Sequence, residues 1–470
     1  MRKIGREIDI RTASARPVSG KSLVAFRVVF GAVVAASAIR LLLTDWAVSL
    51  YGGPTRHFAY AGLGWLPVPS AFLMRVMITA IAIAAVLVML GYRYRISMLI
   101  LWVLFTWMEF TEATVYLNHY WFISVMGALM IFLPMDSHDA VPVGSVWLVR
   151  FQVAVVYVFA GIAKLHGDWL LHGLPMSLWL GTRSDLPVVG GLLESVTTAV
   201  VLSWAGALFD CFVVVFLLWR RTRLVAWLTV FAFHVLTWLL FPIIGVFPFL
   251  MVGASLIFFD PDWPTRLPDW LTRFAGIRDS GTARIHRTHP TRVTDRSGEA
   301  RPTISRWVTD RSGEARPTIS LWVMAGAALW LTFQVLFPLR HVLYQGDARW
   351  TGEGYRFAWN VLATEKAGDV VFRVTDLASG GTVRTDATDL FTPQQWRTMA
   401  TDPELIRQAA HYVANEEAGT RGVPVSRLQV RVDAFVSFNG RRARRIIDPD
   451  VDLAVEPMRF GHQRWIRPAR

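Results

Sequence analysis

Long apolar runs recur along most of the chain, and an α-helix of about 20 apolar residues is long enough to cross a membrane. The runs cover residues 23–43, 72–90, 96–117, 119–134, 147–165, 195–219, 224–240, 244–259 and 321–338. Several of them are short or closely joined, so the pattern predicts about eight to nine spans. We therefore expect an α-helical polytopic membrane bundle.

The pattern changes after the last apolar run. Three segments alternate or are rich in β-branched residues, which predicts strands: 355–361, 370–375 and 428–438. Asn439-Gly440 follows the third segment and predicts a type I′ hairpin turn. Thr392-Pro393 predicts the start of a helix, with the threonine as N-cap, and a second helix is expected over 403–417. These elements predict a small α+β domain rich in β-strands.

Basic segments divide the chain further. Residues 1–22 hold six Lys or Arg against two acids, and the linker 261–320 holds eleven Arg against seven acids. The linker contains a tandem repeat, VTDRSGEARPTIS, which begins at Val293 and again at Val308. This composition cannot build a packed core, so we expect a disordered loop, and two copies are too few for a solenoid. The expected divisions are a basic N-terminal segment (1–22), a transmembrane domain (23–260), the linker (261–320), a last transmembrane helix (321–338) and a C-terminal domain (339–470).

The positions of the basic clusters predict an orientation. Besides the N-terminal segment and the linker, Arg93 with Arg95 and the group Arg220, Arg221 and Arg223 follow the second and sixth runs. With nine spans, all four clusters fall on one side, which the positive-inside rule assigns to the cytoplasm. We expect an integral plasma-membrane protein with a cytoplasmic N-terminus and an extracytoplasmic C-terminal domain.

Composition excludes several other classes. Hydrophobic residues make up 53% of the chain and charged residues 18%, which is too apolar for an ordinary soluble protein. The net charge of +13 accompanies no recognised nucleic-acid motif, so membrane lipid is the expected partner and nucleic acid is not. Cys211 is the only cysteine, so no internal disulfide is possible, and we interpret it as a packed small hydrophobe. There is no Walker A loop, dinucleotide fingerprint, HExxH or paired-cysteine zinc motif, and we expect no metal.

One lysine is a candidate for chemistry. The chain has 48 basic residues but only four lysines, and Lys164 is the lysine that falls within an apolar run. A desolvated lysine can lose its proton and act as a base, whereas an arginine cannot. The alternative is a lysine that reaches out to the membrane interface or pairs with Asp168 one turn further on. The residues leave these two interpretations open.

Other polar groups lie near Lys164 in the predicted topology. Tyr157 and Gly161 share a helix face with Lys164, although simple helix packing would also explain that face. Asn118 and His119 fall at the same membrane face as Lys164, where a structural role is the simpler alternative. His234 lies within the seventh run, before a Pro- and Gly-containing turn (241–248), and it is a weaker candidate for the same reason.

Taken together, several segments resemble the vitamin K-dependent γ-glutamyl carboxylase family in its bacterial form, whose membrane part is shared with the HTTM group. The segments are Tyr116-Leu-Asn-His-Tyr120, Tyr157-Val-Phe-Ala-Gly-Ile-Ala-Lys-Leu165 with Gly167-Asp-Trp169, His234 with Phe241 to Pro248, Phe258 to Pro264, Trp350 to Asn360, Asn439-Gly-Arg441 and Ile447 to Leu453. The resemblance covers about residues 20–265 and 325–455 in the family's order. It is the ordered set, rather than any one segment, that is specific.

The resemblance implies a membrane enzyme of the carbon–carbon lyase class. A basic group deprotonates a reduced naphthoquinone such as reduced vitamin K, reaction with O2 gives the epoxide and a strong base, and that base removes a γ-proton from a Glu side chain, which then adds CO2. The family's catalytic lysine corresponds to Lys164, its Asn-His pair corresponds to Asn118 and His119, and Tyr355 and Trp359 would help to form the Glu-side pocket. The implied partners are a lipid-soluble quinone and a Glu-containing secreted or membrane protein.

The sequence also departs from the family and leaves alternatives. A single cysteine forbids the disulfide found in the animal enzymes, and no docking site for a Glu-rich substrate is evident. One alternative is a quinone epoxidase without carboxylase activity. Another is a non-enzymatic protein that binds quinone or lipid, or a proton-coupled transporter, for which an intramembrane lysine and histidine would also be suited.

Overall fold

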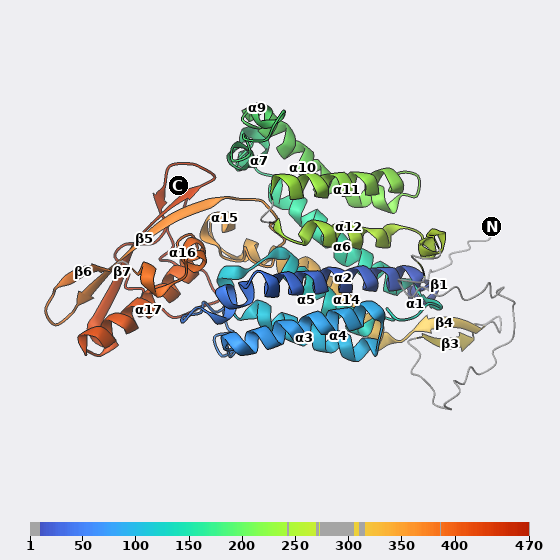
Figure 1. Cartoon of the computed structure of the whole chain (residues 1–470), viewed down its shortest axis with the longest axis horizontal. Helices are drawn as coiled ribbons and strands as arrows, with labels where there is room; N and C mark the ends of the chain where they lie inside the picture. Colours follow the sequence, from blue (N-terminus) through green and yellow to red (C-terminus); the bar gives the residue numbers. More distant parts are fainter. Residues whose placement is uncertain are drawn as a thin grey trace, which may run out of the picture.

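The computed structural model describes residues 10–241, 244–268, 272, 305–309, 315–385 and 387–469. Within these ranges, nine apolar helices form a bundle in which successive helices run in alternating directions (Figure 1). They are α2 (Lys21–Leu43), α3 (Ala71–Leu90), α4 (Tyr94–Phe110), α5 (Asn118–Phe132), α6 (Val143–Lys164), α10 (Val196–Leu218), α11 (Arg223–Leu240), α12 (Phe247–Ser255) and α14 (Leu321–Leu339). Each helix coincides with one of the apolar runs. The prediction of a polytopic helical bundle is therefore confirmed.

The helices differ in their capacity to cross a bilayer. In the described part of the chain, six are long and apolar enough to do so: α2, α3, α6, α10, α11 and α14. The helices α5 and α12 are apolar but shorter. Such a mixture is typical of a bundle in which some helices are shielded from lipid by their neighbours, and α5 is indeed buried along most of its length.

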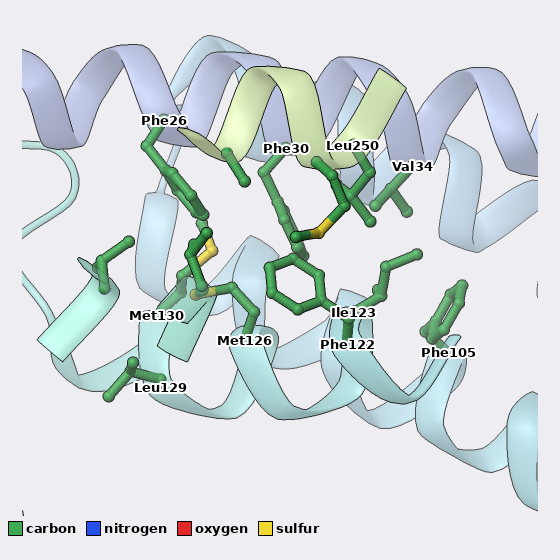
Figure 2. Close-up of a cluster of buried hydrophobic side chains, with 14 of the residues drawn as sticks. Phe26, Phe30, Val34, Phe105, Phe122, Ile123, Met126, Leu129, Met130 and Leu250 are labelled. Carbon is green, nitrogen blue, oxygen red and sulfur yellow. The ribbon is translucent and has the colours of Figure 1, made fainter. Parts of the chain in front are cut away.

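Close packing at the centre of the bundle holds α2 against its neighbours. Figure 2 shows Phe26 and Phe30 of α2 together with Phe122 and Met126 of α5 and Leu250 of α12. All five side chains are buried. Because lipid is as apolar as these side chains, this contact stabilises the bundle through van der Waals packing rather than through exclusion of water.

Short elements connect the helices. They are α1 (Ile10–Ala15), β1 (Pro17–Ser19), η1 (Ala47–Gly52), η2 (Ala113–Val115), β2 (Ala140–Pro142), α7 (Gly167–His172), α8 (Met176–Gly181), α9 (Gly190–Leu193), η4 (Leu256–Phe258) and η5 (Trp263–Arg266). The strands β1 and β2 pair antiparallel and tie the chain before α2 to the chain before α6.

Described residues from three of the four predicted basic clusters meet at one end of the bundle. The backbone of Ser22, at the start of α2, bonds to the carbonyl oxygen of Pro261 at 3.0 Å, and Arg223 forms an ion pair with Asp260 at 2.9 Å. The C-terminal domain lies at the opposite end (Figure 1). The nine crossings and the assignment of the basic end to the cytoplasm both stay predictions.

The C-terminal domain packs helices against a small antiparallel sheet of strand order β6-β5-β7-β8. Its elements are α15 (Ala348–Thr351), β5 (Lys366–Asp376), β6 (Thr382–Thr385), η7 (Thr388–Leu390), α16 (Pro393–Met399), α17 (Pro403–Arg421), η8 (Val425–Arg427), β7 (Leu428–Phe438) and β8 (Arg444–Arg445); η6 (Arg340–Leu343) joins it to α14. Alternate residues of β7, from Leu428 to Val436, are buried and pack with the buried face of α17. The predicted α+β class is confirmed.

Local predictions in this domain are also confirmed. The predicted strands 370–375 and 428–438 lie within β5 and β7. Thr392 caps α16 in a capping box with Gln395. Asn439 and Gly440 have φ angles of 50° and 73°, as a type I′ turn requires.

The prediction of a strand over 355–361 is wrong. The segment is a series of turns in which Phe357 and Trp359 have φ angles of 60° and 59°, which no strand accommodates. The aromatic side chains that suggested a strand pack into the membrane bundle instead, for example Phe357 against Tyr116 and Trp121. Contact between the two domains therefore overrides the local pattern.

The prediction of a disordered linker is wrong for the part that the structure describes. β3 (Ser305–Thr309) and β4 (Ala315–Ile319) pair as an antiparallel hairpin, and Arg11 of α1 donates to the carbonyl oxygen of Ile319 at 3.0 Å. β3 begins at the last residue of the first copy of the repeat and runs into the second copy, and β4 lies within the second copy. The rest of the first copy, from Val293, lies outside the described residues.

Candidate active site

Lys164 is the last residue of α6 and is buried, with 4% of its surface exposed. Its Nζ donates to Asp210 Oδ2 at 2.9 Å, to the carbonyl oxygen of Val361 at 2.9 Å and to that of Ala160 at 3.2 Å. Asp168, the partner considered from the sequence, does not pair with Lys164, because it bonds to Asn439 and Arg441 of the C-terminal domain. The amine of Lys164 is therefore enclosed by protein groups and pairs with Asp210 instead of Asp168.

Asp210 was missed by the sequence analysis. It lies in the middle of α10 and is buried, with 5% of its surface exposed. The signal that could have found it is an acidic residue inside an otherwise apolar helix, where a charged group needs a partner.

A glycine sets the distance between the two helices that carry this pair. A Cβ on Gly161 of α6 would lie 2.7 Å from Cys211 Sγ and 2.8 Å from the backbone nitrogen of Cys211. Since only glycine permits this approach, α6 and α10 meet closely one turn before Lys164, which brings Asp210 within reach of the amine. Gly161 thus positions the ion pair, and Cys211 fills the contact as the expected small residue.

An apolar cavity of about 120 Å³ lies beside the ion pair, and we call it the inner cavity. Its wall is almost entirely apolar, and its polar groups come from Tyr157, Lys164, Asp210, His234 and Thr237. The hydroxyl of Tyr157 is hydrogen-bonded to His234 Nε2 at 3.0 Å, while the buried Nδ1 of His234 has no partner among the described residues. The structure thus brings three of the predicted residues, Tyr157, Lys164 and His234, to one cavity.

A larger and more polar cavity of about 850 Å³, which we call the outer chamber, lies between the bundle and the C-terminal domain. Asn118, His119 and Tyr355 line it. The two cavities adjoin, because both are lined by Leu240, Phe241, Ile244, Phe247, Val361 and Leu362. Lys164 and His119 therefore lie on different cavities rather than in one pocket.

Asn118 and Lys164 hold two neighbouring carbonyl groups of the C-terminal domain. Asn118 Nδ2 donates to the carbonyl oxygen of Asn360 at 3.3 Å, and Lys164 holds that of Val361. Tyr116 donates to Asn118 Oδ1 at 3.1 Å. The segment between the two cavities is thus fixed from both sides by residues of the membrane bundle.

Tyr355 and Trp359 occupy different environments. The hydroxyl of Tyr355 is hydrogen-bonded to Thr364 at 2.9 Å, and burial raises the pKa of Tyr355 to about 12, so the phenol stays protonated near neutral pH. Trp359 is fully buried against Trp121 and Phe122 and lines neither cavity. Of this predicted pair, only Tyr355 faces the outer chamber.

Lys366, which was not singled out from the sequence, lines the outer chamber. The amine of Lys366 donates to the carbonyl oxygen of Trp350 at 2.7 Å. Burial lowers the pKa of Lys366 from its ordinary value of 10.5 to about 8. Its position at the start of β5 gave no signal, because the fold of the C-terminal domain brings the amine against Trp350, which belongs to a different secondary-structure element.

The residues present suit an aromatic quinol better than a metal. Among the described residues, no group of three His, Cys, Asp or Glu side chains could hold a metal ion. The inner cavity is similar in size to apolar cavities of about 150 Å³ that bind a single benzene ring. Its few polar groups, those of Lys164, Tyr157 and His234, are of the kind that can bond to the oxygens of a ring.

These features define an integral membrane protein in which a helical bundle is joined to an α+β domain, with a buried Lys–Asp pair close to their contact. Residues 15–263 match the HTTM domain, and residues 319–470 match the vitamin K-dependent gamma-carboxylase, lumenal domain. The chain therefore belongs to the vitamin K-dependent gamma-carboxylase family and is a carboxylase-like membrane protein. No solved structure matches it.

Proposed function

We propose that Lys164 deprotonates a reduced naphthoquinone in the inner cavity, and that oxygenation of this quinol to its epoxide is coupled to carboxylation of Glu side chains. The observation that carries the proposal is a buried amine at the edge of an apolar, ring-sized cavity. A base in such a site is shielded from water, which would otherwise quench a strongly basic product.

The protonation state of Lys164 is central to this proposal. Its three acceptors match the three protons of an ammonium group, so the geometry suits the charged form. A buried ion pair can convert to a neutral pair when its proton moves across the hydrogen bond. We propose that Asp210 accepts this proton and leaves a neutral amine to act as the base.

Other residues would orient the quinol. Tyr157 and His234, which are joined by a hydrogen bond, can exchange that bond for one to a ring oxygen. The unpartnered Nδ1 of His234 supplies a further polar contact. When bound, the quinol supplies the electrons that reduce O2 and ends as the epoxide.

The outer chamber is the proposed place of the second half-reaction. It lies beside the inner cavity, and its polar lining, including Asn118, His119 and Tyr355, suits an acidic side chain and CO2. We propose that the Glu-containing substrate enters here, from the extracytoplasmic side of the plasma membrane.

The test uses the purified full-length protein in lipid nanodiscs, supplied with reduced naphthoquinone, O2, CO2 and a Glu-containing peptide. Epoxide and carboxylated peptide are measured separately. Both products are expected. Epoxide alone would support the Lys164 chemistry but reject the coupling, and neither product from folded protein would favour a binding or transport protein.

Substitution of Lys164 tests the base directly. Lys164→Arg keeps the positive charge but cannot lose its proton, so epoxide formation should fall by about 100-fold or more. Arg75→Gln is a control, because Arg75 forms an exposed ion pair with Asp45 and lines neither cavity. Full activity of Lys164→Arg would remove the assignment.

A further inference from the structure

An arginine near the outer chamber forms no ion pair in the described part of the chain. Arg40 lies in the last turn of α2, at the end of the bundle nearest the C-terminal domain (Figure 1), and no described residue bonds to its buried Nε. Its guanidinium group stacks on the ring of Trp46, 4.9 Å from the centroid. A partly buried cation without an anionic partner is costly, which makes a site of this kind suited to an anionic ligand.

A second polar atom with unused hydrogen-bonding capacity lies close to Arg40. The Nε2 atom of His119, which lines the outer chamber, is buried and has no hydrogen-bond partner within the described ranges. A Cβ on Gly245 would lie 3.4 Å from Arg40 Nη2 and 3.9 Å from His119 Nε2. The two groups therefore flank one small space beside Gly245, whose lack of a side chain keeps that space open.

Two other basic groups that line the chamber are held by acceptors. Arg356 forms an ion pair with Asp402 at 2.9 Å, and Lys366 donates to the carbonyl oxygen of Trp350. Arg40 and His119 differ from them because both present unused hydrogen-bonding capacity toward the same place.

We propose that Arg40 and His119 form a subsite for a carboxylate-type anion at the edge of the outer chamber. A guanidinium group is well matched to a carboxylate, to which it can donate two parallel hydrogen bonds. The inference deepens the proposed function and rests on it for the source of the anion, which is the side chain of a Glu substrate or bicarbonate. Arg40 would then determine the preference for an acidic ligand.

The test measures binding without turnover, so it needs no quinone. Two fluorescent pentapeptides that differ only in a central Glu or Gln are titrated against the full-length protein in nanodiscs, and anisotropy is recorded. The wild type should bind the Glu peptide about 10- to 100-fold more tightly, as expected for hydrogen bonds to a charged group. Arg40→Gln should abolish this preference, and Arg40→Lys should retain part of it.

Two further variants control the result. Arg75→Gln removes a basic group that is already paired with Asp45, so the Glu preference should be unchanged. Gly245→Ala places a methyl group between Arg40 and His119 and leaves both side chains present, so the Glu preference should weaken. Because Gly245 has a φ of 67°, which strains any other residue, the thermal unfolding of this variant is measured together with its binding. The variant also serves if Arg40→Gln does not fold.

The remaining outcomes separate the two sources of the anion. If the peptides bind equally, the thermal stability of wild type and Arg40→Lys is compared in sodium bicarbonate and sodium chloride. Stabilisation by bicarbonate that is stronger in the wild type assigns the site to the free anion, and equal effects overturn the proposal. A Glu preference that persists in Arg40→Gln overturns it as well. Absence of epoxide from the wild type would instead reject the proposed function and leave the binding result standing.

Discussion

The buried pair of Lys164 and Asp210 is the most constrained feature at the scale of single residues. The side chains are only 5% and 8% exposed, so each charge depends on the other for compensation. A buried ion pair contributes little to stability as a whole, but the loss of one partner is costly because it leaves a lone charge.

This asymmetry gives a prediction for Asp210→Asn. The variant should lose epoxide formation, because the amine no longer has a carboxylate to take its proton. Its free energy of unfolding should fall by about 3–5 kcal/mol. The double variant Lys164→Met/Asp210→Leu should recover most of that stability but no activity. Thermal unfolding and epoxide assays check both points, and an active, unaltered Asp210→Asn protein would contradict them.

Lys366 gives a prediction that depends on pH. Because burial lowers the pKa of Lys366 to about 8, half of its amine should be neutral and nucleophilic near that pH. Brief acetylation at a series of pH values, followed by mass spectrometry, should show labelling of Lys366 that rises with pH around a midpoint of about 8. A midpoint near 10.5 would show that the amine is not desolvated.

Single residues also show what the sequence could and could not predict. Lys164 stood out because it is a lysine within an apolar run, a property of the local sequence. Its partner Asp210 and the group around Arg40 could not be assigned in this way, because helix–helix contacts between residues distant in sequence create them.

At the scale of elements, the contact between α6 and α10 decides the geometry of the ion pair. Gly161 lets the two helices approach, and any side chain there would have to displace the backbone of α10. The element pattern itself was predictable, since each apolar run became a helix. The segment 355–361 was not, because its aromatic residues pack against the other domain rather than along a sheet.

Gly161→Ala should therefore impair the site from a distance. The added methyl group should separate α6 from α10, destabilise the protein by about 1–3 kcal/mol and reduce epoxide formation. Gly326→Ala in α14 is the matched control, because nothing lies within 4 Å of the added Cβ. Equal behaviour of the two variants in unfolding and activity assays would argue against a positioning role for Gly161.

At the scale of the whole molecule, the membrane bundle contributes side chains to the hydrophobic core of the C-terminal domain. Phe58, Tyr60 and Ala113, from loops of the membrane bundle, are buried in the core cluster of the C-terminal domain. Glu112 of the same loop region accepts a hydrogen bond from Gln395 of α16 at 3.1 Å. The C-terminal domain is therefore packed onto one end of the bundle rather than tethered by α14 alone.

The orientation of the whole molecule can be tested with reporters. The four basic clusters and nine crossings predict that the C-terminus is extracytoplasmic. A periplasmic-type phosphatase fused after the last residue should be active, and a fluorescent protein that matures only in the cytoplasm should stay dark. The reverse result would overturn the nine-span topology.

The hydrogen bond between Lys164 and the carbonyl oxygen of Val361 joins the proton chemistry of one domain to the position of the other. A ligand that moves the segment around Val361 would alter this hydrogen bond and, with it, the free energy with which the Lys164 amine binds its proton. Thermodynamic linkage then requires the converse, so that the protonation of Lys164 changes the affinity for that ligand by the same factor. A substrate held by the C-terminal domain and a proton held in the membrane would be heterotropic effectors of one another.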